Sequence, residues 1–327
     1  MAERQVFIVG TGRSGTTILR KVLRNHSRVH AFSKELRFIT DADGLIDLAE
    51  TLTQNWNPFN ASEAIVEFRD LMLKYLWGQR IHHFALSALY MFVLGGAARK
   101  YRFLTLHDTI PYEHCKDTLD AFIDKITVGQ TSGYWYGSKS YQMNPVLYVT
   151  RRMDMDELYP LMGQFIDELL SYPLRGTSKT CWCDDTPINI LNGHHIARML
   201  DNARLIHLYR DPRDVVASYA DSEQAWAPND PVLSAHWVRE IMKEWSEERK
   251  AIGSEQYLEI KYENLVADQE AYMHDIADFI GIEFEDVLLD IELVPHSVGR
   301  YKKDIPESDL PEVTRIVEPV LDEYGYV

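Results

Sequence analysis

The first strand-like run of the chain leads directly into a glycine-rich loop, and this order restricts the fold more than any other feature. Val6–Val9 is a short apolar run typical of a buried strand, and Thr16–Arg24 is compatible with a helix. Gly10, Gly12 and Gly15 stand between them. Such a loop directs backbone N–H groups and the positive end of the helix dipole toward one anion. The sequence therefore predicts a phosphate cradle at the end of a strand.

The loop has the spacing of a Walker A motif but lacks its lysine. Gly10 and Gly15 match Gly-x-x-x-x-Gly, yet Thr16-Thr17 follow where that motif has Lys-Ser/Thr. Arg13 lies inside the loop instead. This pattern suits a nucleotide with a single 5′-phosphate position and a further anionic group beyond it. An ordinary glycine turn between a strand and a helix is the alternative for this segment alone.

A second strand, turn and helix is predicted around residue 210. Leu205–Tyr209 is its apolar run, and Asp211-Pro212 suits the first turn of a helix. Arg210 and Ser218 stand eight residues apart. Two turns of helix are about seven residues, so Ser218 is expected on the side of the helix that starts near Arg210. The alternative is that Arg210 only forms an ion pair with the aspartates around it.

The two segments together resemble the sulfotransferase family, whose donor is 3′-phosphoadenosine 5′-phosphosulfate (PAPS). Members have Arg or Lys before Ser/Gly-Gly-Thr-Thr, similar to residues 13–17, and an Arg and a Ser spaced like Arg210 and Ser218. The resemblance implies a P-loop NTPase-like three-layer α/β fold with a central parallel sheet. It also implies that Arg210 and Ser218 bind the 3′-phosphate. Binding of the 5′-phosphosulfate is then expected of the loop residues Gly12, Arg13, Ser14, Gly15, Thr16 and Thr17.

A third segment, Ser33-Lys34-Glu35-Leu36-Arg37-Phe38, contains the candidate base. Sulfuryl transfer to an alcohol or amine needs a group that takes the acceptor proton. The segment is similar to Lys-Glu-x-x-Phe of glycan sulfotransferases and to Glu-x-Arg of tyrosylprotein sulfotransferases. The resemblance implies that Glu35 is the general base, while Arg13 stabilises charge on the bridging oxygen. A surface ion pair with Arg37 is the other role open to Glu35.

Two later segments resemble the family in less detail. Asp185 stands where many members have a lysine, and in some members that lysine contacts the transferring group. Lys179 or Lys34 could substitute for the missing lysine. Near the end, a basic turn resembles a Gly-Arg-aromatic loop that closes over the donor's phosphates, although a solvated turn is the alternative. The residues of this turn that we expect to bind the donor are Gly299, Arg300, Tyr301 and Lys302.

Composition restricts the partners of the chain. Its 327 residues carry a net charge of −16, which disfavours nucleic acid and anionic membranes, whereas residues 1–37 have eight Lys/Arg against two Asp/Glu. Three cysteines are too few for a disulfide scaffold or a zinc site. No run approaches 18 apolar residues, and no signal region precedes the first strand. We expect a cytoplasmic protein without a membrane span or a bound metal.

Residues 41–180 match no motif of the family, and we expect a largely helical insertion that covers the acceptor within a single domain of residues 1–327. Apolar residues recur at helical spacing in four ranges. The expected helices are Leu45–Leu52, Ala64–Trp77, Ile81–Leu94 and Leu158–Leu170. Gly129–Tyr141 is expected to be a loop whose aromatic side chains could stack on an acceptor.

The sequence as a whole predicts a PAPS-dependent sulfotransferase that acts by in-line displacement on a hydroxyl or amine of a small molecule, lipid or glycan. Two alternatives stay open. One is a P-loop nucleotide kinase or NTPase, which would need the missing lysine, and the other is a non-catalytic protein that binds 3′-phosphoadenosine nucleotides. If Glu35 is not the base, His107 and His296 are the remaining candidates. The residues do not specify the acceptor or the oligomeric state.

Overall fold

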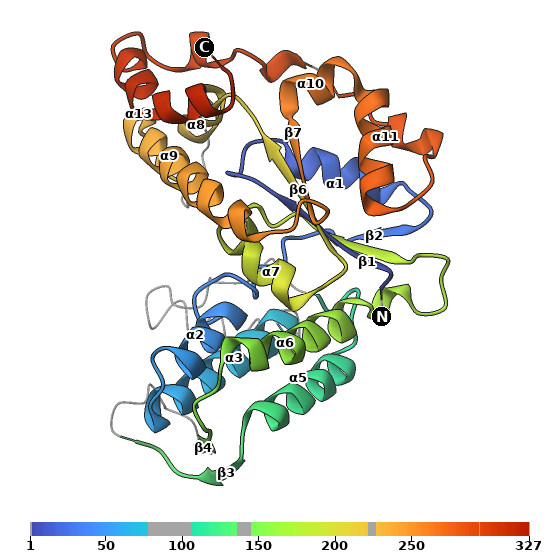
Figure 1. Cartoon of the computed structure of the whole chain (residues 1–327), viewed down its shortest axis with the longest axis vertical. Coiled ribbons are helices and arrows are strands. Elements are labelled where there is room, and N and C mark those ends of the chain that lie inside the picture. The colour runs from blue at the N-terminus through green and yellow to red at the C-terminus, as the bar shows by residue number, and fades with distance from the viewer. Residues whose placement is uncertain (1, 78–105, 136–144, 222–226, 294, 327) are drawn as a thin grey trace. The chain divides into compact units, whose positions relative to one another are not determined.

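The described part of the chain forms two compact units (Figure 1). A computed structural model describes residues 2–77, 106–135, 145–221, 227–293 and 295–326. The sheet unit consists of residues Glu3–Phe32, Ser178–Ala197 and Asp201–Val327. The helical unit consists of residues Met1–Ala2, Ser33–Thr177 and Arg198–Leu200.

The sheet unit is built on five parallel strands in the order β2-β5-β1-β6-β7. The strand β1 is therefore central, and each connection between parallel neighbours requires a crossover. Because carboxyl ends of parallel strands meet at one edge, the loops that follow β1, β5 and β6 lie side by side. The strands are β1 Arg4–Val9, β2 Val29–Ala31, β5 Cys181–Asp184, β6 Ala203–Tyr209 and β7 Tyr257–Lys261.

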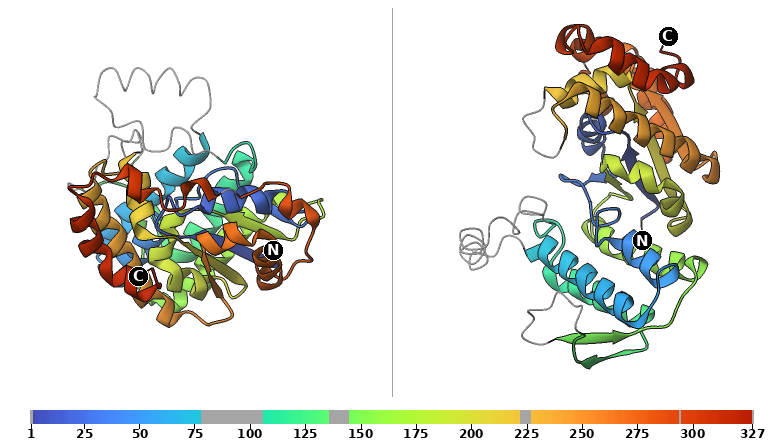
Figure 2. Two further views of the ribbon diagram at one scale, coloured as in Figure 1. Left: turned by 90° about the horizontal axis from the view of Figure 1, so that it is seen from above. Right: turned by 90° about the vertical axis from the view of Figure 1, so that its left-hand side faces the viewer.

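Helices cover both faces of this sheet (Figures 1 and 2). Alternate strand residues such as Val6 and Ile8 pack with the apolar sides of α1 and α11 on one face. On the other face, Trp245 of α9 packs against His207 with ring centroids 5.0 Å apart. A parallel sheet buried on both faces needs such apolar strands. The predicted three-layer α/β fold with a central parallel sheet is confirmed.

The helices of the sheet unit follow the strands in the order expected for crossover connections. Asp211 begins α8 by accepting a hydrogen bond from the backbone N–H of Arg213, as the predicted helix start requires. The helices are α1 Thr16–Arg24, α7 Gly193–Met199, α8 Pro212–Ala220, α9 Pro231–Glu248, α10 Tyr262–Ala267, α11 Gln269–Ile280, α12 Tyr301–Asp304 and α13 Leu310–Glu323.

The helical unit packs four described helices around an aromatic core. Phe165 lies 4.9 Å from Phe122 and 5.9 Å from Phe68 between ring centroids. The helices are α2 Leu45–Thr53, α3 Pro58–Trp77, α5 Tyr112–Ile126 and α6 Met155–Leu170. The predicted largely helical character of this region is confirmed, while the predicted helix at Ile81–Leu94 lies outside the described residues. That the range 41–180 covers the acceptor stays a prediction.

The prediction of a loop from Gly129 is wrong for its first residues. Gly129–Ser132 forms β3, which pairs antiparallel with β4, Val146–Val149. All four residues of β3 are exposed, so the segment lacks the apolar alternation from which a strand is predicted. Pairing with β4 supplies the order that the local sequence does not encode. Tyr136 and the rest of the predicted loop to Tyr141 lie outside the described residues.

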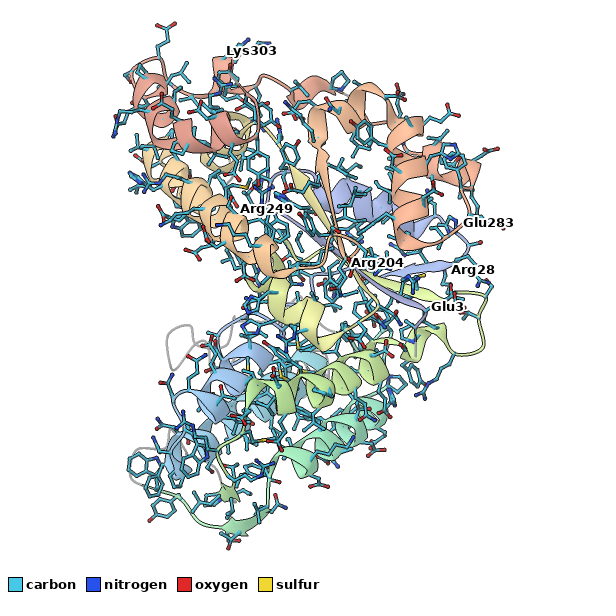
Figure 3. All side chains as sticks on the ribbon, viewed as in Figure 1. Glu3, Arg28, Arg204, Arg249, Glu283 and Lys303 are labelled. Atoms are coloured by element: carbon cyan, nitrogen blue, oxygen red, sulfur yellow. The ribbon has the colours of Figure 1, made fainter. Side chains whose placement is uncertain are left out.

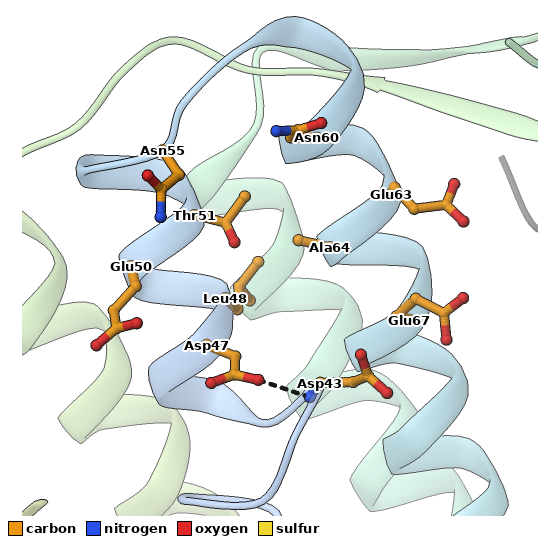
Figure 4. A pocket seen from close by; sticks show the side chains of 10 residues that line it. All are labelled: Asp43, Asp47, Leu48, Glu50, Thr51, Asn55, Asn60, Glu63, Ala64 and Glu67. Atoms are coloured by element: carbon orange, nitrogen blue, oxygen red, sulfur yellow. Dashed lines mark hydrogen bonds between the residues drawn. The ribbon is translucent and has the colours of Figure 1, made fainter. Parts of the chain in front are cut away.

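A pocket of about 490 Å³ lies between α2 and α3 in the helical unit (Figure 4). Its lining includes several carboxylates, and one of them, Asp47, accepts a 2.9 Å hydrogen bond from the backbone N–H of Asp43. Such a lining repels phosphate groups.

None of the helices in the described ranges is both long and apolar enough to cross a bilayer.

An ion-pair network lies on the face of the sheet that α9 covers. Glu259 on β7 accepts 2.9 Å hydrogen bonds from His207 Nδ1 and Trp245 Nε1, and its other oxygen lies 2.8 Å from Arg249. Figure 3 labels Arg249 of this network. Burial alone would raise the pKa of Glu259, but these partners outweigh it and lower the pKa from 4.5 to about 2. The network therefore ties β6 and β7 to the end of α9.

Replacement of Glu259 by glutamine should lower the free energy of unfolding by about 2 kcal/mol at pH 7, because the charged hydrogen bonds are lost. A depressed folded-state pKa stabilises the fold above pH 4.5, and this contribution is lost as the pH falls toward 2. The difference from wild type should therefore shrink below pH 4.5. Thermal unfolding followed by circular dichroism between pH 3 and 7 measures it. Glu255→Gln, at an exposed position, is the control, and a difference that does not change with pH would contradict the assignment.

Candidate phosphate-binding site

The loop after β1 has the backbone of an anion cradle. Gly12, Arg13 and Gly15 have φ values of 73°, 56° and 105°, so that successive N–H groups turn toward a common point. In the described ranges, the backbone N–H groups of residues 12–17 have no protein acceptor, and the N–H of Ile18 donates to the Gly15 carbonyl at 3.0 Å. These amides are therefore available as hydrogen-bond donors, and their contact with a 5′-phosphosulfate stays a prediction.

Close packing explains why two of these positions are glycine. A Cβ atom on Gly15 would lie 2.8 Å from the ring of Tyr262, and one on Gly12 would lie 2.8 Å from the Tyr219 hydroxyl. Tyr219 also donates a hydrogen bond to the carbonyl of Thr11. Both tyrosines support the loop from outside. The sequence carries no signal for Tyr219, whereas Tyr262 begins Tyr262-Glu263-Asn264-Leu265, which resembles a common family segment of structural role.

The two predicted phosphate segments meet directly. The Nε atom of Arg13 donates a 3.0 Å hydrogen bond to the hydroxyl of Ser218 on α8. Arg210, at the end of β6, reaches the Arg13 carbonyl at 3.5 Å and lies with its guanidinium 5.2 Å from the ring centroid of Tyr262. The structure therefore brings Arg13, Arg210 and Ser218 together.

The ion pair that was the alternative role for Arg210 is also present. Arg210 lies 3.3 Å from Asp214 and donates a further hydrogen bond to the Ser297 carbonyl. Its Nε atom is nevertheless buried and has no partner within the described part of the chain. A guanidinium has five N–H donors, so these contacts leave it able to bind an anion.

Asp214 also holds the basic turn near the end of the chain. Its carboxylate accepts hydrogen bonds from the backbone N–H groups of Gly299 at 2.7 Å and of Tyr301 at 3.0 Å. The turn therefore lies beside Arg210, and the predicted closure of Gly299 to Lys302 over the donor's phosphates stays a prediction. The backbone amides of Gly299 and Tyr301 bind Asp214, whereas the sequence predicted that the turn contacts the donor's phosphates. The spacing of Asp214, midway between Arg210 and Ser218 on one helix face, was the signal for this role.

Cationic side chains of the turn have protein partners as well. Arg300 pairs with Asp304 at 2.6 Å and with Asp221 at 2.8 Å. The Lys302 ammonium lies 5.7 Å from the ring centroid of Tyr301. Contact between these side chains and a donor nucleotide stays a prediction.

Lys179 is not placed to substitute for the lysine that many family members have at the position of Asp185. Its ammonium donates to the carbonyls of Val29 at 2.6 Å and His26 at 3.3 Å, at the amino end of β2. The cradle lies at the opposite, carboxyl edge of the sheet. This suggestion from the sequence is therefore wrong, because strand direction separates Lys179 from the loop. Lys34 belongs to the helical unit.

Glu35 belongs to the helical unit, where it forms the ion pair that was its alternative role. The Nη1 atom of Arg37 lies 3.1 Å from Glu35 Oε2, and Arg37 also pairs with Asp41 at 2.9 Å. The side chain of Glu35 is 34% exposed, so it is accessible to solvent. His107 pairs with Asp108 at 2.7 Å, and the side chain of His296 lies outside the described residues. The choice of base stays a prediction.

Unpaired buried atoms show that the cradle suits a phosphate ligand. The Ser14 hydroxyl is fully buried without a hydrogen-bond partner in the described ranges, as is Nε of Arg210. Such groups cost free energy unless a ligand satisfies them. Together with the free loop amides, they form a donor-rich surface at the loop. Within those same ranges, no group of three or more His, Cys, Asp or Glu side chains is placed to hold a metal.

The fold and the site define an α/β protein with a glycine-rich loop between its central strand and first helix. The chain belongs to the sulfotransferase family, whose model matches residues 5–91 and 111–286. A protein-tyrosine sulfotransferase of Drosophila melanogaster is 26% identical over 114 residues, which are 33% of this chain and 22% of that protein. The match thus spans under a quarter of that relative's length.

Solved sulfotransferase structures show similarity over nearly the whole chain. The sulfotransferase domain of the Synechococcus PCC 7002 olefin synthase is 16% identical, with a TM-score of 0.49 and coverage of 96% of this chain and 93% of that one. The sulfotransferase domain from the curacin biosynthetic pathway is 17% identical, with a TM-score of 0.45 and coverage of 96% of each chain.

Replacement of Gly15 by alanine should lower the free energy of unfolding by about 3 kcal/mol, from left-handed backbone strain and the clash with Tyr262. Gly176→Ala is the matched control, because Gly176 has a φ of 72° with no atom within 4 Å of an added Cβ. It should cost about 1 kcal/mol, from strain alone. Chemical denaturation of the three proteins measures both values. Equal losses in the two variants would contradict the packing role of Gly15.

Proposed function

We propose that this protein transfers the sulfuryl group of PAPS to a hydroxyl or amine acceptor. Membership of the sulfotransferase family gives the class of reaction. The hydrogen bond from Arg13 to Ser218 supports the donor assignment most directly, because it joins the two segments expected to bind the 5′-phosphosulfate and the 3′-phosphate. A donor with an anionic group at each end fits a cradle that has Arg13 at one end and Arg210 at the other. A nucleotide without a 3′-phosphate would leave Arg210 without its ligand.

In this proposal the loop binds the 5′-phosphosulfate and stabilises the transition state. The amides of residues 12–17 and the hydroxyls of Thr16 and Thr17 orient the 5′-phosphate. The bond from sulfur to the bridging oxygen breaks as the bond from sulfur to the acceptor forms, and the bridging oxygen leaves with 3′-phosphoadenosine 5′-phosphate (PAP). Arg13 stabilises the negative charge that grows on that oxygen.

The acceptor proton passes to Glu35 in the proposed reaction. Loss of this proton makes the acceptor oxygen or nitrogen a better nucleophile as the new bond forms. The support for Glu35 is its sequence context, four residues beyond the carboxyl end of β2 at Ala31.

Replacement of Arg210 by alanine should weaken PAP binding about 100-fold, because charged hydrogen bonds to the 3′-phosphate are lost. Binding of 5′-AMP should change less than about threefold. Isothermal titration calorimetry with both nucleotides measures the two effects, and Arg239→Ala, on an exposed stretch of α9, is the control. Because this change leaves Asp214 buried without its cation, Ser218→Ala serves as a second, uncharged variant and should weaken PAP alone. Equal loss for both nucleotides would remove the 3′-phosphate assignment.

Replacement of Glu35 by glutamine should lower kcat about 100-fold and leave PAP affinity unchanged, since a base acts on the acceptor. Asp41→Asn is the matched control, because Asp41 binds the same guanidinium of Arg37 without being a base. Turnover is measured with labelled PAPS and an acceptor found by screening alcohols, phenols and amines. Similar losses in both variants would mean that Glu35 only holds Arg37, and His107 would become the next residue to replace.

The two alternative functions differ in what they bind and turn over. A nucleotide kinase or NTPase would hydrolyse ATP with Mg²⁺ and prefer ATP to PAP, which the loop without a lysine disfavours. A non-catalytic protein would bind PAP with dependence on the 3′-phosphate but transfer nothing to any acceptor. Titration of PAP, 5′-AMP and ATP into the protein therefore distinguishes a sulfotransferase from a nucleotide kinase or NTPase. The acceptor screen distinguishes it from a non-catalytic binding protein.

A further inference from the structure

A buried carboxylate at the end of β5 forms part of the floor beneath the loop. Asp185 is 2% exposed, and its Oδ2 atom lies 2.9 Å from Nε of Arg20 on α1. Its Oδ1 atom is buried without a hydrogen-bond partner within the described ranges. Desolvation of two charges offsets most of their attraction, so the ion pair by itself contributes little stability.

The position of Asp185 relative to the loop follows from the sheet. Asp184 pairs with Phe7 in the register of β5 and β1, so Asp185 follows its strand at the edge where β1 leads into the loop. Thr17 and Arg20 stand three residues apart on α1 and therefore share one side of the helix. Arg20 reaches the Asp185 carboxylate at 2.9 Å, and Thr17 stands nearly one turn earlier on the same side of the helix. Burial raises the pKa of Asp185, and interactions with Arg20 and with the Thr17 side chain oppose that shift.

The same arrangement of residue types has another use in P-loop NTPases. There a loop Ser/Thr and an aspartate at the end of a neighbouring strand hold Mg²⁺ against the nucleotide phosphates. Here Thr17 and Asp185 have those two positions, but the guanidinium of Arg20 lies against the carboxylate. A fixed cation of the protein thus stands where those proteins would place their metal ion.

We propose that Asp185, paired with Arg20, is a positioning residue for the donor site, and that its carboxylate orients the Thr17 hydroxyl toward the 5′-phosphate. This inference rests on the proposed function. Arg20 balances the charge of Asp185, which would otherwise repel the bound phosphate. Thr17 is exposed while Asp185 is buried, so the threonine is the member of the pair that contacts the ligand. Asp185 therefore contributes to binding only through Thr17.

A double-mutant cycle tests this dependence. Thr17→Val, Asp185→Asn and the double variant are titrated with PAP and with 3′-AMP, which lacks the 5′-phosphate. Each single change should weaken PAP about tenfold, as for a hydrogen bond to a charged group, and should leave 3′-AMP unchanged. The double variant should lose the same tenfold and not 100-fold, because Asp185 has no effect once the hydroxyl is gone. Thr17→Ser should bind PAP like wild type.

Two controls keep the cycle interpretable. Lys21→Gln removes a charge from an exposed position of the same helix and should change neither affinity. If Asp185→Asn does not fold, Arg20→Met with Asp185→Leu takes its place in the cycle, since an apolar pair of similar volume can replace a buried ion pair. Each variant's thermal unfolding is measured without ligand.

Three results would overturn the inference. They are additive losses in the cycle, equal losses for PAP and 3′-AMP, and full PAP affinity in Thr17→Val. Each of these would appear in a protein whose wild-type form binds PAP, so the proposed function would still hold. If wild type instead does not bind PAP, the proposed function itself fails, and this inference fails with it.

Discussion

One hydrogen bond, from Arg13 to Ser218, joins residues 205 positions apart in the chain, and the proposed donor site depends on the geometry that allows it. The bond is possible because β1 and β6 are neighbours in the sheet, with Val9 paired with His207. Parallel strands bring the loop and the start of α8 to the same edge. Arg210 follows β6 and therefore reaches the loop as well. The order of strands in the sheet thus assembles a two-ended cradle from separate segments.

The parts of the structure that could be predicted from the sequence are those encoded in contiguous residues. The helix at Thr16–Arg24 has the predicted bounds, and β6 extends the predicted run by two residues to Ala203. Apolar runs, glycines and a helix-starting proline all act locally. Arg210 and Ser218 belong to one contiguous strand-and-helix segment, so this part of the candidate site could be predicted from the sequence alone.

Other parts depend on pairing between distant segments, which local patterns do not specify. The exposed strand Gly129–Ser132 exists only because β4 supplies its partner. The support of the loop by Tyr219 and Tyr262 follows from how α8 and α10 pack, and no local pattern specifies these contacts. The direction of β5 places Lys179 at the wrong edge of the sheet, although its position in the sequence is close to Asp185. In each case the missing information was which segment lies beside which.

A single aromatic ring contacts both ends of the cradle. Tyr262 packs against Gly15 in the loop and lies beneath the guanidinium of Arg210, 5.2 Å from its ring centroid. This ring therefore lies between Gly15 of the loop and the arginine and contributes to their separation. An engineer who wanted the protein to accept a longer or shorter dianion would have to change this tyrosine first. Residues that contact the ligand directly could then be adjusted around the new separation.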